Sequence, residues 1–135
     1  MKEEFFPYRI LTHRVFGRIK IPLITLILRH ARSVKLYALV DSGAVISIFP
    51  KSICDLLGLM YESGEKASLF TATREEIPVR VHRVVVRIGD IEFEARVGFS
   101  EVEKIPHVLG RLDVLENVEV RFERDGVRLV ARDQL

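Results

Sequence analysis

The sequence predicts a mostly-β domain, built as a closed barrel or a sandwich. Apolar and polar residues alternate over many short segments, and glycine, proline or Asp-Gly separates these segments. No long helical pattern interrupts them. The chain has 135 residues, of which 48% are hydrophobic. This is enough to bury one core, so we expect a single domain over residues 1–135.

Charge, apolar runs and cysteine content argue against several classes of protein. The 21 basic and 19 acidic residues are interspersed and give a net charge of +2, so we expect no nucleic-acid partner. The longest apolar run, residues 21–28, is too short for a membrane helix, so we expect no membrane partner. The single Cys54 excludes an internal disulfide and favours a cytoplasmic protein. Abundant charged residues with few side-chain amides hint at a thermophilic source.

Two strands are expected to lead to an acidic residue. Residues 1–18 have a mixed pattern that suggests a segment packed on another surface, such as a partner chain. The alternation at 18–21 gives way to the apolar run 21–28, as in a strand that enters the core. After the polar break at 30–33, residues 34–40 form a second strand. We expect these two strands to pair as a hairpin, with Asp41 at its far end.

A short helix and a polar hairpin follow. Pro50 and Gly58 mark the start and stop of the helix, whose apolar face carries Ile53, Leu56 and Leu57. Cys54 near this face is expected to be a buried, unreactive thiol. The polar interval 61–76 reads as a mobile hairpin between two strands, and Pro78 suits only an edge or a bulge.

The second half of the chain predicts further hairpins. Residues 84–88 and 91–97 flank a Gly-Asp turn, with Glu92, Glu94 and Arg96 facing water. A second apolar strand at 105–111 ends in glycine and arginine, and a short helix is expected at 112–117. Asp125-Gly126 between alternating runs predicts a C-terminal hairpin within residues 118–135.

Asp41 is the ionisable residue in the most apolar setting. Asp-Ser-Gly is also ordinary turn chemistry, so a purely structural turn is one interpretation and a catalytic carboxylate is the other. The four histidines lack metal-ligand spacing, residues 58–66 lack the spacing of a phosphate-binding loop, and Ser42 lacks a nucleophile-elbow context. We therefore expect no metal and no cofactor.

Two segments share one plan: an apolar strand, a glycine and a short helix, at 39–57 and at 108–117. With Asp41-Ser42-Gly43-Ala44, Ser47 and Phe49-Pro50 in the first, and Val108-Leu109-Gly110-Arg111 in the second, residues 20–130 resemble the retropepsin-like aspartic proteases. The resemblance favours the catalytic interpretation of Asp41.

This resemblance implies a closed, mostly-β protomer with two short helices, which works as a homodimeric aspartic endopeptidase on peptide or protein substrates. Each chain would supply one Asp41, because peptide hydrolysis by this route needs two carboxylates that share a proton. Ser42, Gly43 and Ala44 would support the active-site loop. A flap at residues 62–78 would carry the substrate-binding positions Leu69, Phe70, Thr71, Ala72 and Thr73. The alternative function is a dimerisation or peptide-binding module of the same fold with little or no hydrolysis.

The chain departs from the retroviral pattern at several positions. Retroviral members often carry an acidic residue right after Asp-Thr/Ser-Gly-Ala, where it pairs with the arginine of the second motif, whereas this chain has Val45. We therefore expect Arg111 to pair with Asp113 or with the other subunit. The flap lacks a glycine-rich tip, and the hairpin at 118–135 suggests a dimer sheet of its own kind, with residues 1–18 at the same interface.

Overall fold

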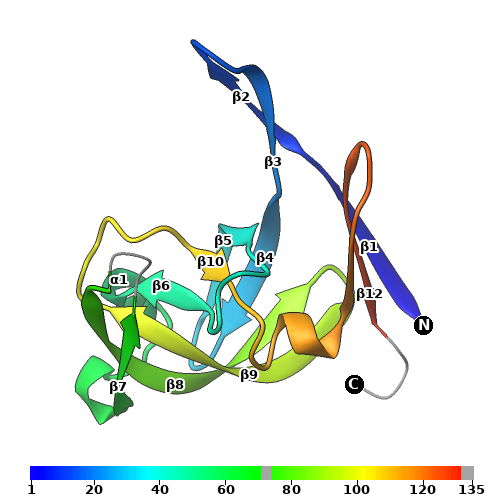
Figure 1. Cartoon of the computed structure of the whole chain (residues 1–135). Helices are drawn as coiled ribbons and strands as arrows, with labels where there is room; N and C mark the ends of the chain where they lie inside the picture. Colours follow the sequence, from blue (N-terminus) through cyan, green and yellow to red (C-terminus); the bar gives the residue numbers. More distant parts are fainter. Residues whose placement is uncertain (71–73, 132–135) are drawn as a thin grey trace.

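The computed structural model describes residues 1–70 and 74–131, which form twelve strands, one α-helix and two 3-10 helices (Figure 1). In chain order they are β1 (Lys2–Pro7), β2 (Arg9–His13), β3 (Gly17–Ile21), β4 (Leu23–Arg29), β5 (Ser33–Val40), β6 (Ile48–Pro50), α1 (Lys51–Leu56), η1 (Tyr61–Ser63), β7 (Glu65–Phe70), β8 (Glu76–Ile88), β9 (Ile91–Ser100), β10 (Val108–Leu109), η2 (Leu115–Asn117), β11 (Glu119–Phe122) and β12 (Gly126–Ala131). The mostly-β prediction is confirmed.

The main sheet closes on itself. Its order is β4-β5-β10-β6-β9-β8-β7, and β4 also pairs with β8, so the ladder runs through six strands and returns to its start. Closure removes the open edges that a flat sheet would expose. Phe49 and Phe99, both fully buried, meet inside with their ring centroids 6.3 Å apart.

Three local predictions are confirmed in this sheet. β4 and β5 pair antiparallel over seven residues, which places Asp41 directly after the hairpin's second strand. β8 and β9 pair around the Gly89-Asp90 turn, and Glu92, Glu94 and Arg96 are exposed. Pro78 pairs only with Ser68 of β7, because β9 joins β8 from Arg80 onward, so this proline lies where β8 is an edge.

The short helix follows β6 as expected, with two differences. Pro50 is the residue before the helix, and Gly58, with φ +81°, ends it beyond Leu57. Ile53, Cys54 and Leu57 are buried, but Leu56 is 55% exposed, so its assignment to the apolar face was wrong. The predicted helix at 112–117 is smaller than expected, because residues 111–114 form turns and only η2 is helical.

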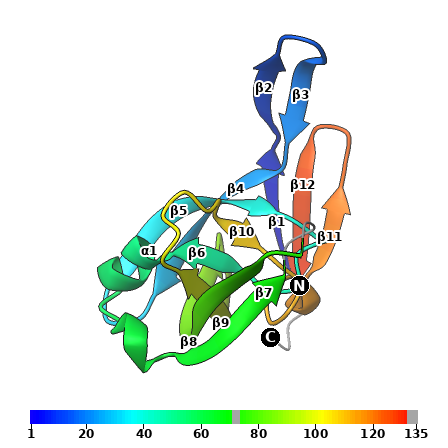
Figure 2. The same ribbon diagram turned by 60° about the vertical axis from the view of Figure 1, so that its left-hand side comes forward.

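A second, three-stranded sheet joins the two ends of the described chain. β12 lies between β1 and β11, with β1 paired over six residues from Lys2 to Pro7 (Figure 2). Val127 and Leu129 of β12 belong to the main core. The carboxylate of Glu4 accepts a hydrogen bond of 2.8 Å from the Asp90 amide, which ties this sheet to the β8–β9 turn. The predicted C-terminal hairpin therefore exists, and within the chain it pairs with β1.

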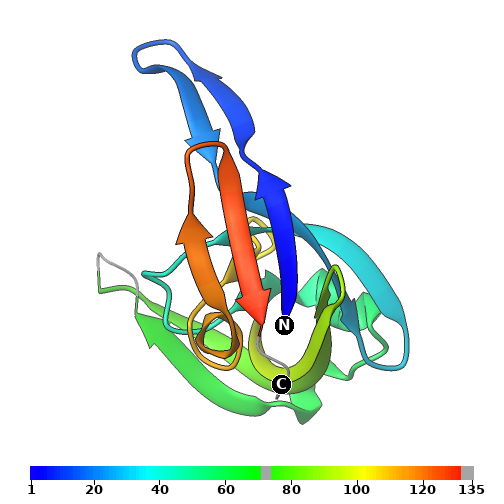
Figure 3. The ribbon, with the colours of Figure 1, turned by 90° about the vertical axis from the view of Figure 1, so that its right-hand side faces the viewer.

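The hairpin of β2 and β3 projects away from the rest of the molecule (Figures 1 and 3). We call residues 9–21 the arm. All five β2 residues are exposed, and its tip carries Val15 and Phe16, which are 69% and 75% exposed. The chain runs from β3 through Pro22 directly into β4, so the arm's base adjoins the main sheet.

Candidate active site

Asp41 lies where β5 leaves the closed sheet. β10 runs parallel to β5 and pairs Leu109 with Val40, and the amide of Asp41 donates to the carbonyl of Leu109 at 3.1 Å. The amide of Val40 donates to the carbonyl of Pro22 at 2.9 Å. Backbone hydrogen bonds from two neighbouring segments thus fix the last residues before the carboxylate.

The carboxylate itself is half-buried and bonded to its own loop. The amide of Gly43 donates to Asp41 Oδ1 at 2.9 Å, and the amide of Ala44 donates to the Asp41 carbonyl at 3.1 Å. These bonds form a tight turn, so the turn interpretation of Asp-Ser-Gly is correct in local geometry. The same turn presents the carboxylate at the surface beside the exposed Ser42, so it does not exclude the catalytic interpretation.

Two loops cross next to Asp41. The amide of Arg111 donates to the Ala44 carbonyl at 2.9 Å, and the amide of Leu112 donates to the Val45 carbonyl at 2.8 Å. A β-carbon at Gly110 would lie only 2.4 Å from the Ile46 carbonyl oxygen, so no other residue fits this crossing without a backbone shift. The second sequence motif therefore serves as the support for the first.

Ser47 holds this crossing from inside. Its side chain is fully buried, and its hydroxyl accepts a hydrogen bond of 2.9 Å from the amide of Gly110. Its carbonyl accepts another of 2.9 Å from the amide of Gly98 in β9. The resemblance drew attention to Ser47, but its role became visible only with the crossing, because its partner is 63 residues away.

A small apolar cluster lies between the Asp41 loop and the β7–β8 hairpin. Ile48, Val79 and Val108 are its buried members. The partly buried residues packed against them are Ala44, Ile46, Leu69, Ile77, Val81 and Ile105. Two positions predicted for the site, Ala44 and Leu69, therefore meet here. The β8 members were missed from the sequence, although their alternation at 77, 79 and 81 was the available signal.

The expected flap coincides with the β7–β8 hairpin. Glu65–Phe70 of β7 pairs antiparallel with Glu76–Val81 of β8. The predicted flap residues Thr71, Ala72 and Thr73 lie outside the described residues.

At the base of the β7–β8 hairpin, Arg80 Nη1 donates to the carbonyls of Glu62 and Gly64, at 2.7 and 3.2 Å. His82, buried below, bonds the Tyr61 carbonyl through Nε2 at 3.1 Å. The hairpin thus rises from a firmly bonded base.

The expected Arg111–Asp113 pair is not formed, which corrects that prediction. Asp113 instead accepts hydrogen bonds of 2.7 and 3.1 Å from the guanidinium of Arg96, and one of 3.0 Å from its amide. These bonds hold the pKa of the Asp113 carboxyl below its usual value. The Arg111 side chain is exposed and makes no ion pair with the described part of the chain. A partner in another subunit stays a prediction.

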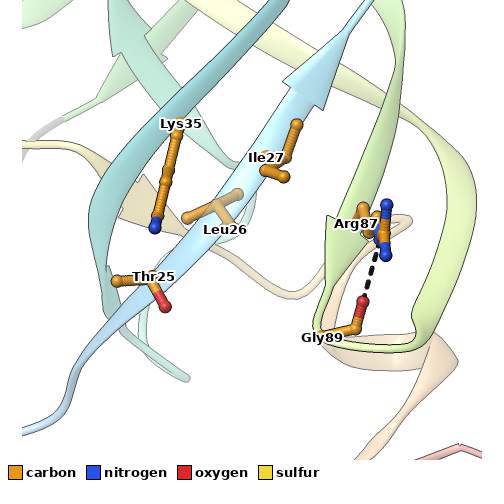
Figure 4. A pocket seen from close by; sticks show the side chains of 6 residues that line it. All are labelled: Thr25, Leu26, Ile27, Lys35, Arg87 and Gly89. Carbon is orange, nitrogen blue, oxygen red and sulfur yellow. Dashed lines mark hydrogen bonds between the residues drawn. The ribbon is translucent and has the colours of Figure 1, made fainter.

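A shallow hollow of about 230 Å³ lies on the outer face of β4, β5 and β8 (Figure 4). Thr25, Ile27, Lys35 and Arg87 line it, and Arg87 Nε donates to the Gly89 carbonyl at 3.0 Å. Its ionisable groups are both cationic, so it lacks the carboxylate that hydrolysis of this type needs. Asp41 therefore remains the candidate centre.

Neither a metal site nor a membrane helix is seen in residues 1–70 and 74–131. No group of three or more His, Cys, Asp or Glu side chains in these ranges is placed to bind a metal ion. No helix within them combines the length and apolar character that a membrane crossing requires. Cys54 is fully buried, and burial raises the pKa of its thiol to about 11.

Comparison with known proteins places the fold. The sequence matches no protein-family model and no curated protein. A retropepsin-like aspartic protease from Rickettsia conorii is similar in structure, with a TM-score of 0.64, 20% identity, and coverage of 95% of this chain and 92% of the other. The EIAV protease, in complex with the inhibitor HBY-793, gives a TM-score of 0.56 at 17% identity and covers 78% of this chain and 92% of its own. The chain has the fold of the retropepsin-like aspartic proteases.

Proposed function

We propose that the chain is an aspartic endopeptidase that acts as a homodimer. The carrying observation is the crossed-loop support of Asp41: a half-buried carboxylate held by Gly43, on a loop bonded to Arg111 and Leu112, within a fold shared with proteases of this class. A structural turn alone needs no second loop from a segment almost 70 residues further along the chain. The arrangement is that of a carboxylate kept in a fixed position.

The chemistry requires a second carboxylate, and a second copy of the chain is its simplest source. Asp55 is on α1, and Asp90, Asp113 and Asp125 are in turns, so none lies on a loop like that of Asp41. A twofold axis brings identical loops together, because a residue on the axis faces its own copy. We place the two Asp41 carboxylates within hydrogen-bond distance of each other across such an axis.

The pair would then act on a water molecule and a peptide carbonyl. One carboxylate takes a proton from water while the oxygen of that water attacks the carbonyl carbon. The other, protonated, donates its proton to the carbonyl oxygen and so stabilises the tetrahedral intermediate. Collapse of the intermediate breaks the carbon–nitrogen bond, and the amine leaves with a proton returned by the pair. Because one shared proton is needed, activity should peak below neutrality.

The apolar cluster beside the loop indicates the substrate's side chains. Ala44, Ile46 and Ile105 approach from the barrel, and Leu69 and Ile77 from the hairpin. Partly buried aliphatic residues on both sides favour peptides with apolar side chains next to the scissile bond. A peptide between barrel and hairpin would bind as an extended strand, with its main chain hydrogen-bonded to their edges. In this proposal Leu69, Phe70, Thr71, Ala72 and Thr73 belong to the flap that covers it.

Asp41→Asn tests the function. The variant keeps the shape of the side chain and an oxygen for the Gly43 amide, so we expect an intact fold and unchanged mass in solution. Cleavage of a casein or peptide-library substrate should fall at least about a thousandfold, because the pair loses its proton transfer. Asp55→Asn, at an exposed carboxylate on α1, is the matched control and should retain activity.

The outcomes separate the proposal from its alternative. Equal cleavage by the wild type and Asp41→Asn would disprove the mechanism. If the wild type binds unfolded peptide but does not cleave it between pH 3 and pH 8, the chain is a peptide-binding module of the same fold.

A further inference from the structure

We propose that the arm, residues 9–21, packs against a second copy of the chain and so stabilises the dimer that brings the two Asp41 loops together. This inference rests on the proposed function in one respect, namely the need for a second Asp41. Its evidence is the arm itself, which no part of the proposed mechanism uses.

Within the described residues, the arm beyond its base has little cover: all of β2 and the tip are exposed, and only Ile19 and Ile21 are half-buried. Its strands pair only with each other, from Arg9–Ile21 to His13–Gly17, and project from the body (Figures 1 and 2). A two-stranded hairpin is marginally stable in water on its own. Each strand of five residues extends about 17 Å, so the arm could reach well across a neighbouring molecule.

The two faces of the arm differ. Because side chains alternate along a strand and paired residues share a face, Leu11, Ile19 and Ile21 lie on one side. We call this the apolar face. Phe16 joins it at the tip, where its ring lies 5.0 Å from that of His13. The opposite face carries Ile10, Thr12, Arg18 and Lys20. Such a hairpin has one side suited to burial and one suited to solvent.

The base of the arm is anchored, so its direction is fixed. On the face opposite the apolar one, Lys20 Nζ donates to the Arg124 carbonyl at 2.9 Å. On the apolar face, the guanidinium of Arg9 lies over the Tyr37 ring, 5.0 Å from its centroid. Tyr8, just before the arm, donates its hydroxyl to the Glu123 carbonyl at 2.7 Å. These contacts on both faces fix the orientation of the arm relative to the body.

The strand that contacts the base of the apolar face, β5, also leads to Asp41. Tyr37, which meets Arg9, is on β5; Leu39 follows on the same side of that strand, and Asp41 comes directly after the strand ends at Val40. Leu39 pairs with Leu23, and both are half-buried, while Ala38 and Val40 face the core. β5 thus links the arm's base, through the Arg9–Tyr37 contact, to the Asp41 loop at its other end. In this proposal one second chain contacts both the Asp41 loop and the apolar face.

Charge favours the same partner. The arm contains Arg9, Arg14, Arg18 and Lys20 and no acidic residue, a net charge of +4. The rest of the chain has 17 basic and 19 acidic residues, a net charge of −2. An arm from one copy is thus attracted to the body of another, while two arms repel each other. The hollow lined by Lys35 and Arg87 is also cationic, so it would repel the basic arm of a second copy.

Matched substitutions on the two faces test the arm. Leu11→Ser and Phe16→Ser change the apolar face, and Ile10→Ser changes an equally accessible residue on the opposite face: Leu11 is 54% and Ile10 46% exposed. Sedimentation equilibrium over a range of concentrations gives the dimer dissociation constant, and circular dichroism checks the fold. We expect Leu11→Ser to raise this constant at least about tenfold, and Ile10→Ser to change it less than about twofold.

Activity measured in parallel separates this inference from the proposed function. At concentrations that restore the dimer, Leu11→Ser should regain wild-type cleavage, because the arm acts on association. If the wild type is dimeric, Leu11→Ser dissociates it and neither cleaves peptide, the inference stands and the proposed function fails. The inference is overturned if Leu11→Ser leaves the dimer intact, if Ile10→Ser weakens it equally, or if the wild type is monomeric. Monomers that bind phosphatidylserine vesicles through Phe16 would also overturn it.

Discussion

Removing the hydroxyl oxygen of Ser47 should lower both the free energy of unfolding and the activity. Ser47→Ala removes only this oxygen and leaves the amide of Gly110, its donor at 2.9 Å, buried without an acceptor. A buried polar group that loses its partner costs about 1–3 kcal/mol. We expect the free energy of unfolding to fall by that amount.

Ser100→Ala is a matched control. Ser100 is also fully buried, and its hydroxyl also accepts a backbone hydrogen bond, from the amide of Val102 at 3.0 Å. That bond lies within one loop and does not join the crossing. Val102 is 53% exposed, so water is closer to the freed amide, and we expect a smaller loss of about 0.5–1.5 kcal/mol.

Urea unfolding at fixed protein concentration and kcat for one peptide are the two measurements. Freed from Ser47, the loop of Gly110 can shift against that of Asp41, and a displacement of about 1 Å at a catalytic group can cost about a hundredfold in rate. Ser47→Ala should therefore lower both the free energy of unfolding and kcat, whereas Ser100→Ala should leave kcat within about twofold. Unchanged unfolding and unchanged kcat in Ser47→Ala would refute the role assigned to the crossing.

Two further predictions concern groups away from the centre. Arg96 holds the pKa of Asp113 below its usual value, so this pair stabilises the fold above the unfolded-state pKa, and the contribution is lost as pH falls through the folded-state pKa. Asp113→Asn, which also tolerates the local φ of 62°, should flatten the fall in stability below about pH 4. The effect should be less than about 1 kcal/mol, because nearly half of the Arg96 side chain (46%) is exposed and water screens the pair; an acid profile identical to the wild type would contradict this. Cys54, with its thiol pKa near 11 and no exposed surface, should react with a disulfide reagent at pH 8 only after unfolding; rapid labelling of the native protein would show that the site opens locally.

Local signals explain why much of the fold could be predicted from the sequence. The hairpins β4–β5, β8–β9 and β11–β12 each join neighbouring segments across a short turn, so a few residues reveal them: a polar break at 30–33 in the first, and Gly-Asp or Asp-Gly in the other two. The short helix was bounded by Pro50 and Gly58 for the same reason. Asp41 stood out because an apolar strand directly precedes it and Ser42-Gly43 follows.

The parts that were missed depend on partners far along the chain. β10 has only two residues, yet it joins β5 to β6 and creates the crossing beside Asp41. β1 pairs with β12 at the other end of the sequence, which no local pattern reveals. Arg96 is 17 residues from Asp113 and was read as a solvent-facing strand residue, which it is, so its ion pair depends on how the η2 loop packs.

The exposure of the arm is another feature that could not be predicted from local sequence signals. Residues 9–21 have an ordinary hairpin alternation, but only the structure shows that β2 and the tip stay exposed, and that the described chain touches the arm mainly at its base. The expectation that residues 1–18 meet a partner stays a prediction. In the structure this segment consists of two parts, β1 and most of the arm. β1 pairs with β12 of its own chain along one edge, whereas the arm's strands pair only with each other, so our proposal assigns the partner contact to the arm.

A mixing experiment tests most directly the claim that one active site is built from two chains. Wild-type protein and Asp41→Asn are unfolded together, refolded at fixed total concentration above the dimer dissociation constant, and assayed for cleavage at several ratios. If each site needs an Asp41 from both chains, activity follows the square of the wild-type fraction and is about one quarter at equal amounts. A linear decline, to about one half at equal amounts, would show that each chain acts alone and would contradict the dimeric site.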